Sequence, residues 1–345
     1  MGKTGRNSLP SRLFPEQDEL ALLRRIRKLA AKQPGRVQLG IGDDCALLRL
    51  RPNEEVAVTT DLSIDGRHFR LAWHPADAVG HRALARGLSD LAAMGARPLG
   101  AFLSLGLPRE LTRTKNSGAW EERFFNGLLA LAAECKVPLA GGDLAESPIV
   151  LADIVLVGAV PRGRALLRSG AGPGDQIYVT GALGGAAAGL KRLEDRAGAA
   201  KAGRRRPLPA QLAAELAAHL YPQPRLAQGL WLQRRGSATA AIDVSDGLST
   251  DLTHLCEESG VAAEVESELI PINAAASLQQ ALHGGEDYEL LFTAKKGVRI
   301  PDAIAGVAVT RIGRVIRRRS GRPLVTIVDG NNRHPLLPQG WRHFS

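Results

Sequence analysis

Two carboxylates three residues apart follow a short apolar run in the second half of this chain. Residues 240–242 are apolar, and the segment DVSDG (243–247) comes next, with Ser245 between Asp243 and Asp246. A strand that stops in carboxylates can hold a hard cation, because Mg²⁺ takes only oxygen ligands. The segment therefore predicts a metal site at the end of a strand.

Similar acidic endings occur three more times along the chain. Apolar runs close at Asp61 and at Asp143, and a fourth acidic turn contains Asp43 and Asp44. Because Mg²⁺ is usually held by one or two carboxylates per ion together with substrate phosphates, several strand-end aspartates indicate one shared multi-metal phosphate site. The alternative is ordinary turn chemistry, since Asp-Gly and Gly-Asp pairs also close turns without any ligand.

Apolar periodicity predicts the elements that must position these aspartates. Helices are expected over 16–31, 75–94 and 120–135, and strands over 56–61, 99–107, 137–141, 149–160 and 176–180. Because strands and helices are mixed, the fold class is α/β or α+β. A stretch rich in Gly, Pro and Arg, 161–174, separates two such patterns, so we expect two domains, 1–160 and 161–345. The basic segment 196–209 is expected to be a mobile loop.

Composition and charge limit the class of protein. The 345 residues are 44% hydrophobic, enough for two cores, and three widely spaced cysteines without ligand or disulfide spacing fit a reducing cytoplasm. We expect neither a signal peptide nor a membrane span, because the apolar stretches are too short. The net charge of +10 leaves a nucleic-acid-binding protein as an alternative, but the basic segments 191–206 and 311–322 contain no aromatic residues for stacking.

A phosphate-binding P-loop is absent from the sequence. Gly2, Lys3 and Thr4 resemble the end of one, but no further glycine or strand precedes them. The glycine-rich segment 180–185 could offer backbone N–H groups to a phosphate, although tight packing of a strand against a helix explains such a segment more often. Metal ions on carboxylates are therefore the expected means of neutralising phosphate charge.

Eight segments together resemble the thiamine-monophosphate kinases, members of the superfamily that also contains aminoimidazole ribonucleotide synthetase and selenophosphate synthetase. In chain order they are LGIGDDCALL (39–48), TTDLSIDGRHF (59–69), LSDLAAMGA (88–96), GGDLAESP (141–148), GRALLRSGAGPGDQIYVTG (163–181), AIDVSDGLSTDL (241–252), GGEDYELLFT (284–293) and GWRHF (340–344). The resemblance runs from about residue 16 to the C-terminus. It implies that ATP phosphorylates thiamine monophosphate to thiamine diphosphate, by direct in-line transfer that is assisted by several Mg²⁺ ions and uses no protein nucleophile.

The resemblance also implies roles for single residues. Positions that match the family's metal ligands are Asp43, Thr59, Thr60, Asp61, Asp90, Asp143, Asp243 and Asp246. Positions that match its ATP contacts are Phe125, Gly142, Asp143, Arg168 and Ser245. His68, Glu286 and Trp341 match contacts to thiamine monophosphate, whose cationic thiazolium and flat pyrimidine suit a carboxylate and an indole. A surface role for Arg168 and structural roles for His68 and Trp341 are the alternatives.

Three positions depart from the family pattern. Gly87 stands where Asn usually precedes Leu-Ser-Asp, Arg67 replaces a small apolar residue before His68, and Glu146 lies in a stretch that is usually rich in Thr. These changes leave every predicted ligand in place but alter the expected acceptor pocket.

The resemblance implies the two-domain aminoimidazole ribonucleotide synthetase-like fold. An N-terminal α/β domain would pair its sheet with that of a second subunit in a homodimer, and an α+β domain would follow. A sister ATP-dependent enzyme such as aminoimidazole ribonucleotide synthetase is the other enzyme class that fits the acidic segments. The segment GGEDYEL (284–290) and the terminal Gly-Trp favour the kinase branch.

Overall fold

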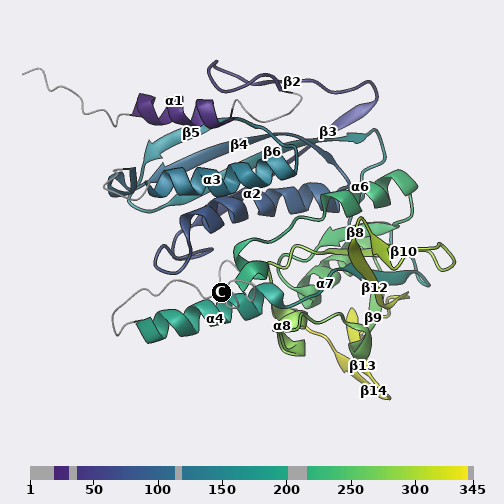
Figure 1. Cartoon of the computed structure of the whole chain (residues 1–345). Helices are drawn as coiled ribbons and strands as arrows, with labels where there is room; N and C mark the ends of the chain where they lie inside the picture. Colours follow the sequence, from purple (N-terminus) through teal and green to yellow (C-terminus); the bar gives the residue numbers. More distant parts are fainter. Residues whose placement is uncertain (1–18, 31–36, 113–118, 201–215, 341–345) are drawn as a thin grey trace, which may run out of the picture.

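The computed structural model describes residues 19–30, 37–112, 119–200 and 216–340, and its first half is built around a four-stranded sheet (Figure 1). The strand order is β3 (Glu54–Ile64), β6 (Leu151–Pro161), β4 (Arg97–Leu107) and β5 (Leu139–Glu146). β6 runs antiparallel to both of its neighbours, whereas β4 and β5 are parallel. β3 and β5 are therefore the two edges of this sheet.

Helices α2 (Ala76–Ala93) and α3 (Trp120–Glu134) cover one face of the sheet (Figure 1). Ile154 and Leu156 of β6 pack in one buried cluster with Leu88 and Leu91 of α2, because alternate strand residues point to the same face. The two helices approach closely at a glycine: a Cβ on Gly127 would lie 1.9 Å from the backbone carbonyl of Asp77. The other elements of this half are α1 (Glu19–Ala30), β1 (Val37–Leu39), β2 (Leu47–Leu48) and η1 (Arg109–Thr112).

The second half contains an eight-stranded sheet. Its order is β14 (Asn332–Pro335), β13 (Val325–Asp329), β9 (Ala262–Glu266), β12 (Val307–Ile316), β7 (Gln176–Thr180), β10 (Leu290–Ala294) and β8 (Ala240–Asp243), and β11 (Ala303–Ile304) pairs with β12. The helical elements are α4 (Gly185–Ala200), α6 (Leu226–Arg235), α7 (Leu248–Ser259), η2 (Ser267–Leu269) and α8 (Leu278–His283). Buried residues of α7 and of these strands form a second core.

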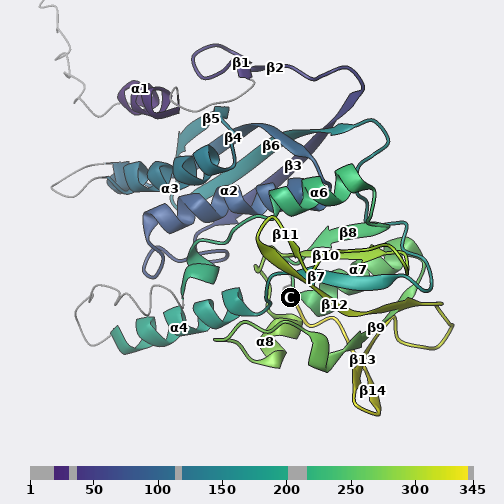
Figure 2. The same cartoon turned by 45° about the vertical axis from the view of Figure 1, so that its right-hand side comes forward.

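Helix α6 of the second half packs against α2 of the first, and Figure 2 shows the two helices side by side. The contact is close, because a Cβ on Gly229 would lie 1.9 Å from the backbone carbonyl of Ala92. Leu226 and Leu232 of α6 belong to the same buried cluster as α2. One apolar core thus continues across the junction and fixes α2 against both halves.

The mixed fold class is confirmed, and each predicted helix and strand that the structure describes is present, with three differences. The prediction that Asp61 and Asp143 end strands was wrong, because β3 continues to Ile64 and β5 continues to Glu146. Both strands have long partners, and backbone pairing overrides the local turn signals. Residues 196–200 of the predicted loop form the end of α4, and 201–209 lie outside the described residues.

None of the helices in the described ranges combines enough length with enough apolar character for a bilayer crossing.

Candidate active site

A cavity of about 460 Å³ lies between the two halves of the chain. Strand β3, the loop 66–74 and helix α2 line it from the first half, and the turn after β8, the segment 285–288 and helix α4 line it from the second. Its lining includes the predicted site residues Thr60, Asp61, His68, Asp90, Asp243, Ser245, Asp246 and Glu286. The fold therefore brings together residues that are up to about 226 positions apart in the chain (from Thr60 to Glu286).

Asp243, the last residue of β8, is 2% exposed. The hydroxyl of Ser89 on α2 donates a hydrogen bond to its Oδ2 at 2.7 Å. Burial and then the nearby Asp90 raise the pKa of Asp243 to about 7. Burial also raises the pKa of Asp90, although its carboxylate accepts a hydrogen bond from Thr59 that acts the other way. Two neighbouring carboxylates, one buried and one half-buried, would be stabilised by a bound cation.

The turn that carries Ser245 and Asp246 is held in place by Asp251 in the first turn of α7. Oδ2 of Asp251 accepts hydrogen bonds from the backbone N–H groups of Ser245, Asp246 and Gly247, each at 3.0 Å. Gly247 has a φ of 115°, a conformation that L side chains rarely adopt. The turn is thus fixed by its own helix, and the sequence motifs gave no role to Asp251.

Arg86 of α2 faces Asp61 of β3 inside the cavity. Its Nε and Nη2 donate to Oδ1 of Asp61 at 3.2 and 2.8 Å. Although burial alone would lower the pKa of the guanidinium, the oxygen groups of Tyr288, Asp61 and Glu286 raise it above its ordinary value. A permanent positive charge therefore lies beside a predicted metal ligand.

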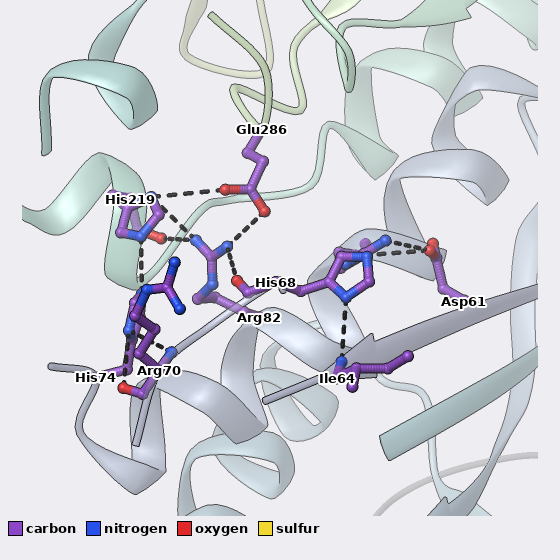
Figure 3. A network of polar contacts seen from close by, with 9 residues as sticks. Asp61, Ile64, His68, Arg70, His74, Arg82, His219 and Glu286 are labelled. Atoms are coloured by element: carbon purple, nitrogen blue, oxygen red, sulfur yellow. Dashed lines mark hydrogen bonds and ion pairs between the residues drawn. The ribbon is translucent and has the colours of Figure 1, made fainter. Parts of the chain in front are cut away.

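Glu286 lines the same cavity and belongs to a buried network of polar side chains (Figure 3). Arg82 donates from Nη2 to Oε1 of Glu286 at 2.5 Å and from Nη1 to the backbone carbonyl of His219. The rings of His219 and His74 meet at their Nε2 atoms, 3.0 Å apart. Burial would raise the pKa of Glu286, but Arg82 and His219 outweigh it and lower the pKa to about 2. Its carboxylate is therefore ionised and already paired with a cation.

The backbone beside Glu286 is strained. Glu286 and Tyr288 have φ values of 69° and 51°, in the left-handed region that non-glycine residues rarely adopt. Their N–H groups donate to the backbone carbonyls of Ser245 at 2.8 Å and Val244 at 2.9 Å. These bonds tie the strained segment to the acidic turn, and such strain is concentrated at functional sites.

Four predicted residues lie elsewhere in the chain. Asp43, Phe125, Gly142 and Asp143 line a second cavity of about 650 Å³. Oδ1 of Asp43 and Oδ1 of Asp143 each accept a hydrogen bond from the N–H of the next residue at 2.9 Å. The single shared site that the four acidic segments predicted is therefore divided, within one chain, between two cavities.

Thr59 and Arg168 line neither cavity. Thr59 hydrogen-bonds to Asp90, which lines the first cavity. Arg168 is exposed, and its backbone carbonyl accepts a hydrogen bond from Ser259 at 2.9 Å. Trp341 lies outside the described residues.

The three departures from the family pattern have different surroundings. Gly87 lets α2 approach the sheet, since a Cβ there would lie 2.8 Å from Cδ1 of Leu156. Arg67 is exposed and lines the first cavity. Glu146 is exposed and pairs with Arg109 at 3.5 Å. Of these three, Arg67 is the one that alters the lining of the cavity.

Several N–H groups of the glycine-rich segment 180–185 are engaged within the protein, since those of Gly181 and Leu183 donate to backbone carbonyls of Ala308 and Pro271. The carboxylate of Asp287 accepts hydrogen bonds from the N–H groups of Gly184 at 2.6 Å and Ala186 at 3.0 Å. This carboxylate takes the place that an anion would occupy at the start of α4.

The carboxylates of the first cavity fit Mg²⁺ only if oxygens of a bound substrate or of water complete its coordination shell. Within the described ranges, no three His, Cys, Asp or Glu side chains converge closely enough to hold a metal ion by themselves. Mg²⁺ is commonly bound by one or two carboxylates, with phosphate and water oxygens completing its shell. The buried Asp243 and the half-buried Asp90, with Asp61 and Asp246 on the same cavity, match that pattern.

Comparison with known sequences places this architecture in a defined class. The AIR synthase related protein N-terminal domain matches residues 42–160, and the corresponding C-terminal domain matches residues 172–325. The chain is thus an AIR synthase related protein with both domains of that class.

Individual relatives narrow the class further. Thiamine-monophosphate kinase of Escherichia coli K12 is 42% identical over 90% of this chain and 93% of its own length. The crystal structure of thiamine-monophosphate kinase from Stenotrophomonas maltophilia K279a has a TM-score of 0.75 and 38% identity, covering 90% of this chain and 96% of its own. AaThiL complexed with AMPPCP and TMP has a TM-score of 0.71 and 30% identity, covering 96% and 98%. This chain belongs to the thiamine-monophosphate kinase family, as predicted.

Proposed function

We propose that this chain transfers the γ-phosphoryl group of ATP to thiamine monophosphate and forms thiamine diphosphate and ADP. The observation that carries the proposal is the cavity in which β3, α2 and the turn after β8 gather four aspartates. The relatives support it, because this chain matches thiamine-monophosphate kinases over nearly their whole length. One of these relatives, AaThiL, was solved in complex with AMPPCP and TMP.

Asp61, Asp90, Asp243 and Asp246 are the residues that would hold Mg²⁺ in this cavity. When bound, the metal would offset the negative charge of the two phosphate-bearing substrates so that they can approach each other. Ser89 and Asp251 fix the carboxylates for this purpose, the first by its bond to Asp243 and the second by holding the turn at Asp246.

No protein nucleophile is required for the transfer. The second pKa of a phosphate monoester is about 6, so the acceptor phosphate already carries the attacking charge at neutral pH. The chain's own contribution is to hold donor and acceptor in line in the cavity between its two halves.

The acceptor's rings fit the part of the cavity lined by His68, Trp73 and Glu286. Trp73 offers an aromatic face, and Arg70 lies over that ring at 5.0 Å from its centre. Because Glu286 is already paired with Arg82, its role is to shape this wall and the acidic turn rather than to neutralise a thiazolium alone.

We also propose a homodimer that unites the two cavities. β3 and β5 are the edges of the first sheet, and neither has a second partner within the described residues. Val56, Val58 and Leu62 of β3 are 52%, 61% and 44% exposed, which is unusual for an edge strand of a protein that stays monomeric. If β3 pairs with β5 of a second copy, the strand that carries Asp61 in one chain lies beside the strand that carries Asp143 in the other.

Substrate dependence tests the proposed function. Purified protein with ATP and Mg²⁺ should form thiamine diphosphate and ADP in equal amounts from thiamine monophosphate, and chelation of the metal should stop the reaction. Free thiamine should not react, because the acidic cavity serves a phosphate that the acceptor already carries. Turnover of thiamine itself, or none of the monophosphate, would refute the proposal.

The cytoplasmic location remains part of this proposal, supported by three free cysteines.

A further inference from the structure

We propose that Arg86 is a further catalytic residue of this chain, whose guanidinium binds the oxygens of the phosphoryl group during its transfer. The proposal rests on the phosphotransferase function proposed above. Neither the acidic motifs nor the family resemblance pointed to this residue.

The position of Arg86 is the first argument. It lies on α2 four residues before Asp90, so both side chains project from the same face of the helix. Both line the first cavity, as do Asp61 and Asp243. The guanidinium is therefore placed among the carboxylates where the phosphates of both substrates would meet.

Its burial is the second argument. The side chain of Arg86 is 14% exposed, whereas Arg67 and Arg70, which line the same cavity, are exposed. A guanidinium that is shielded from water interacts more strongly with a phosphate than one at the rim does. Among the arginines of this cavity that the structure describes, Arg86 is the one suited to an interior anion.

Its hydrogen bonds are the third argument. A guanidinium has five N–H donors in a planar fork, and in the described part of the chain Arg86 uses two of them, both toward Oδ1 of Asp61. The other donors remain for an oxyanion, and Oδ2 of Asp61 remains for a cation. Binding a phosphoryl oxygen and holding Asp61 are therefore compatible.

The chemical step needs no further reactant. A lone pair on an acceptor phosphate oxygen forms the new P–O bond, and the bond between the γ-phosphorus and the bridging oxygen breaks, with its electron pair leaving on ADP. In the transition state, negative charge is spread over the three equatorial oxygens of the phosphoryl group, and a guanidinium can donate hydrogen bonds to two of them at once. Arg86 would thereby stabilise the transition state more than the bound substrates.

A structural alternative makes a different prediction. If Arg86 only offsets the charge of Asp61, its loss would change the Mg²⁺ concentration needed for activity while kcat at saturating Mg²⁺ would stay near the wild-type value. The two roles are therefore separable by kinetics.

The test compares Arg86→Ala, Arg86→Lys and a matched control, Arg314→Met. Arg314 makes the same kind of contact, from Nε and Nη2 to one oxygen of Glu264, but lies on β12 outside both cavities. We expect kcat of Arg86→Ala to fall about 10²–10³-fold at saturating Mg²⁺, with the KM for both substrates within about threefold, and that of Arg314→Met to be unchanged. Guanidinium ion at millimolar concentration should restore part of the activity of Arg86→Ala, because the truncated side chain leaves room for it.

A folded Arg86→Ala protein whose kcat is within threefold of wild type, or whose activity returns with extra Mg²⁺ and not with guanidinium, would overturn the proposal. If Arg86→Ala does not fold, Arg86→Lys decides, since it keeps the charge but loses the fork, and an unchanged kcat would refute the role. A wild-type protein that forms no thiamine diphosphate would instead refute the proposed function.

Discussion

The side chain of Asp243 contacts both halves of the chain and is also a proposed metal ligand. It is buried at the end of β8, accepts a hydrogen bond from Ser89 of α2, and lines the same cavity as Asp246. Asp243→Asn and Asp246→Asn should each lower kcat by about 10²–10³-fold, because an amide fills the same space without offsetting the charge of Mg²⁺. Steady-state rates over a range of Mg²⁺ concentrations measure this.

The control for these variants is Asp175→Asn. Asp175 is also buried, and it accepts hydrogen bonds from Gly172 and Thr239 away from both cavities. We expect near-normal turnover and a loss of about 1 kcal/mol in the free energy of unfolding. Near-normal turnover of both site variants would show that Asp243 and Asp246 are turn residues without a ligand.

The same residue predicts how stability depends on pH when metal is absent. The pKa of Asp243 is raised from 3.8 to about 7, so the folded state binds its proton more tightly than the unfolded state does. This contribution to stability is fully present below pH 3.8 and is lost as the pH rises through 7. At 1.36 kcal/mol per pKa unit the loss reaches about 4 kcal/mol.

Asp243→Asn removes this titration while keeping an acceptor for Ser89. In EDTA, the melting temperature of the variant should therefore rise relative to that of the wild type as the pH is raised from 4 to 8. Saturating Mg²⁺ should reverse the order, since the wild type alone keeps the charged ligand. A difference that does not vary with pH would contradict the assignment.

Single residues also show where sequence reasoning succeeded and where it could not. The acidic turn after β8 was recognisable because apolar residues and then carboxylates follow one another along the chain. Arg82 and Arg86 were not, because a buried ion pair depends on a partner that is distant in sequence, here Glu286 for Arg82 and Asp61 for Arg86. Their spacing from Asp90 on one helix, eight residues for Arg82 and four for Arg86, was the available signal.

At the scale of elements, α2 is the helix that positions most of the site. One face carries Arg82, Arg86 and Asp90 toward the second half, and Gly80 brings another face close to α3. The periodicity of apolar residues predicted this helix to within one residue at each end. The close crossings could not be predicted, because a glycine in a helix does not reveal which backbone it approaches.

Gly80→Ala should disturb both stability and activity. A Cβ there would lie 1.9 Å from the backbone carbonyl of Phe124, so α2 and α3 would have to separate. We expect the free energy of unfolding to fall by about 2–3 kcal/mol. We also expect kcat to fall, because the shift of α2 moves Asp90. Chemical denaturation and steady-state kinetics measure the two effects.

Gly172→Ala is the matched control for this substitution. The nearest atom to a Cβ at Gly172 is 3.9 Å away, so its stability should change by no more than about 0.5 kcal/mol. Equal stability of the two variants would show that the crossing of α2 and α3 tolerates extra volume.

At the scale of the whole molecule, the division of the predicted ligands between two cavities is the main result that the sequence did not anticipate. The motifs for Asp43 and Asp143 look the same along the chain as those for Asp61 and Asp243. Sequence order does not show that β5 lies on the opposite edge of the sheet from β3. The proposed dimer would resolve the division, because pairing of β3 with β5 of a second copy would bring the two kinds of cavity together.

Mixing two inactive variants tests whether the partner completes the site. Asp243→Asn disables the first cavity and Asp143→Asn the second, so each homodimer should be inactive. In a heterodimer, one composite site would carry both substitutions and the other would carry neither. Random pairing gives about half heterodimers, each with one intact site of two, so activity should recover to about one quarter of the wild-type value.

The recovery must depend on exchange of subunits, which provides the control. Co-expression of the two variants, or joint refolding from denaturant, should restore activity, whereas mixing them immediately before the assay should not. If both cavities of a single chain instead formed one complete site, each chain would carry one defect and every mixture would stay inactive. A monomeric mass with full wild-type activity at micromolar concentration would contradict the dimer itself, because β3 would then keep its exposed valines in an active protein.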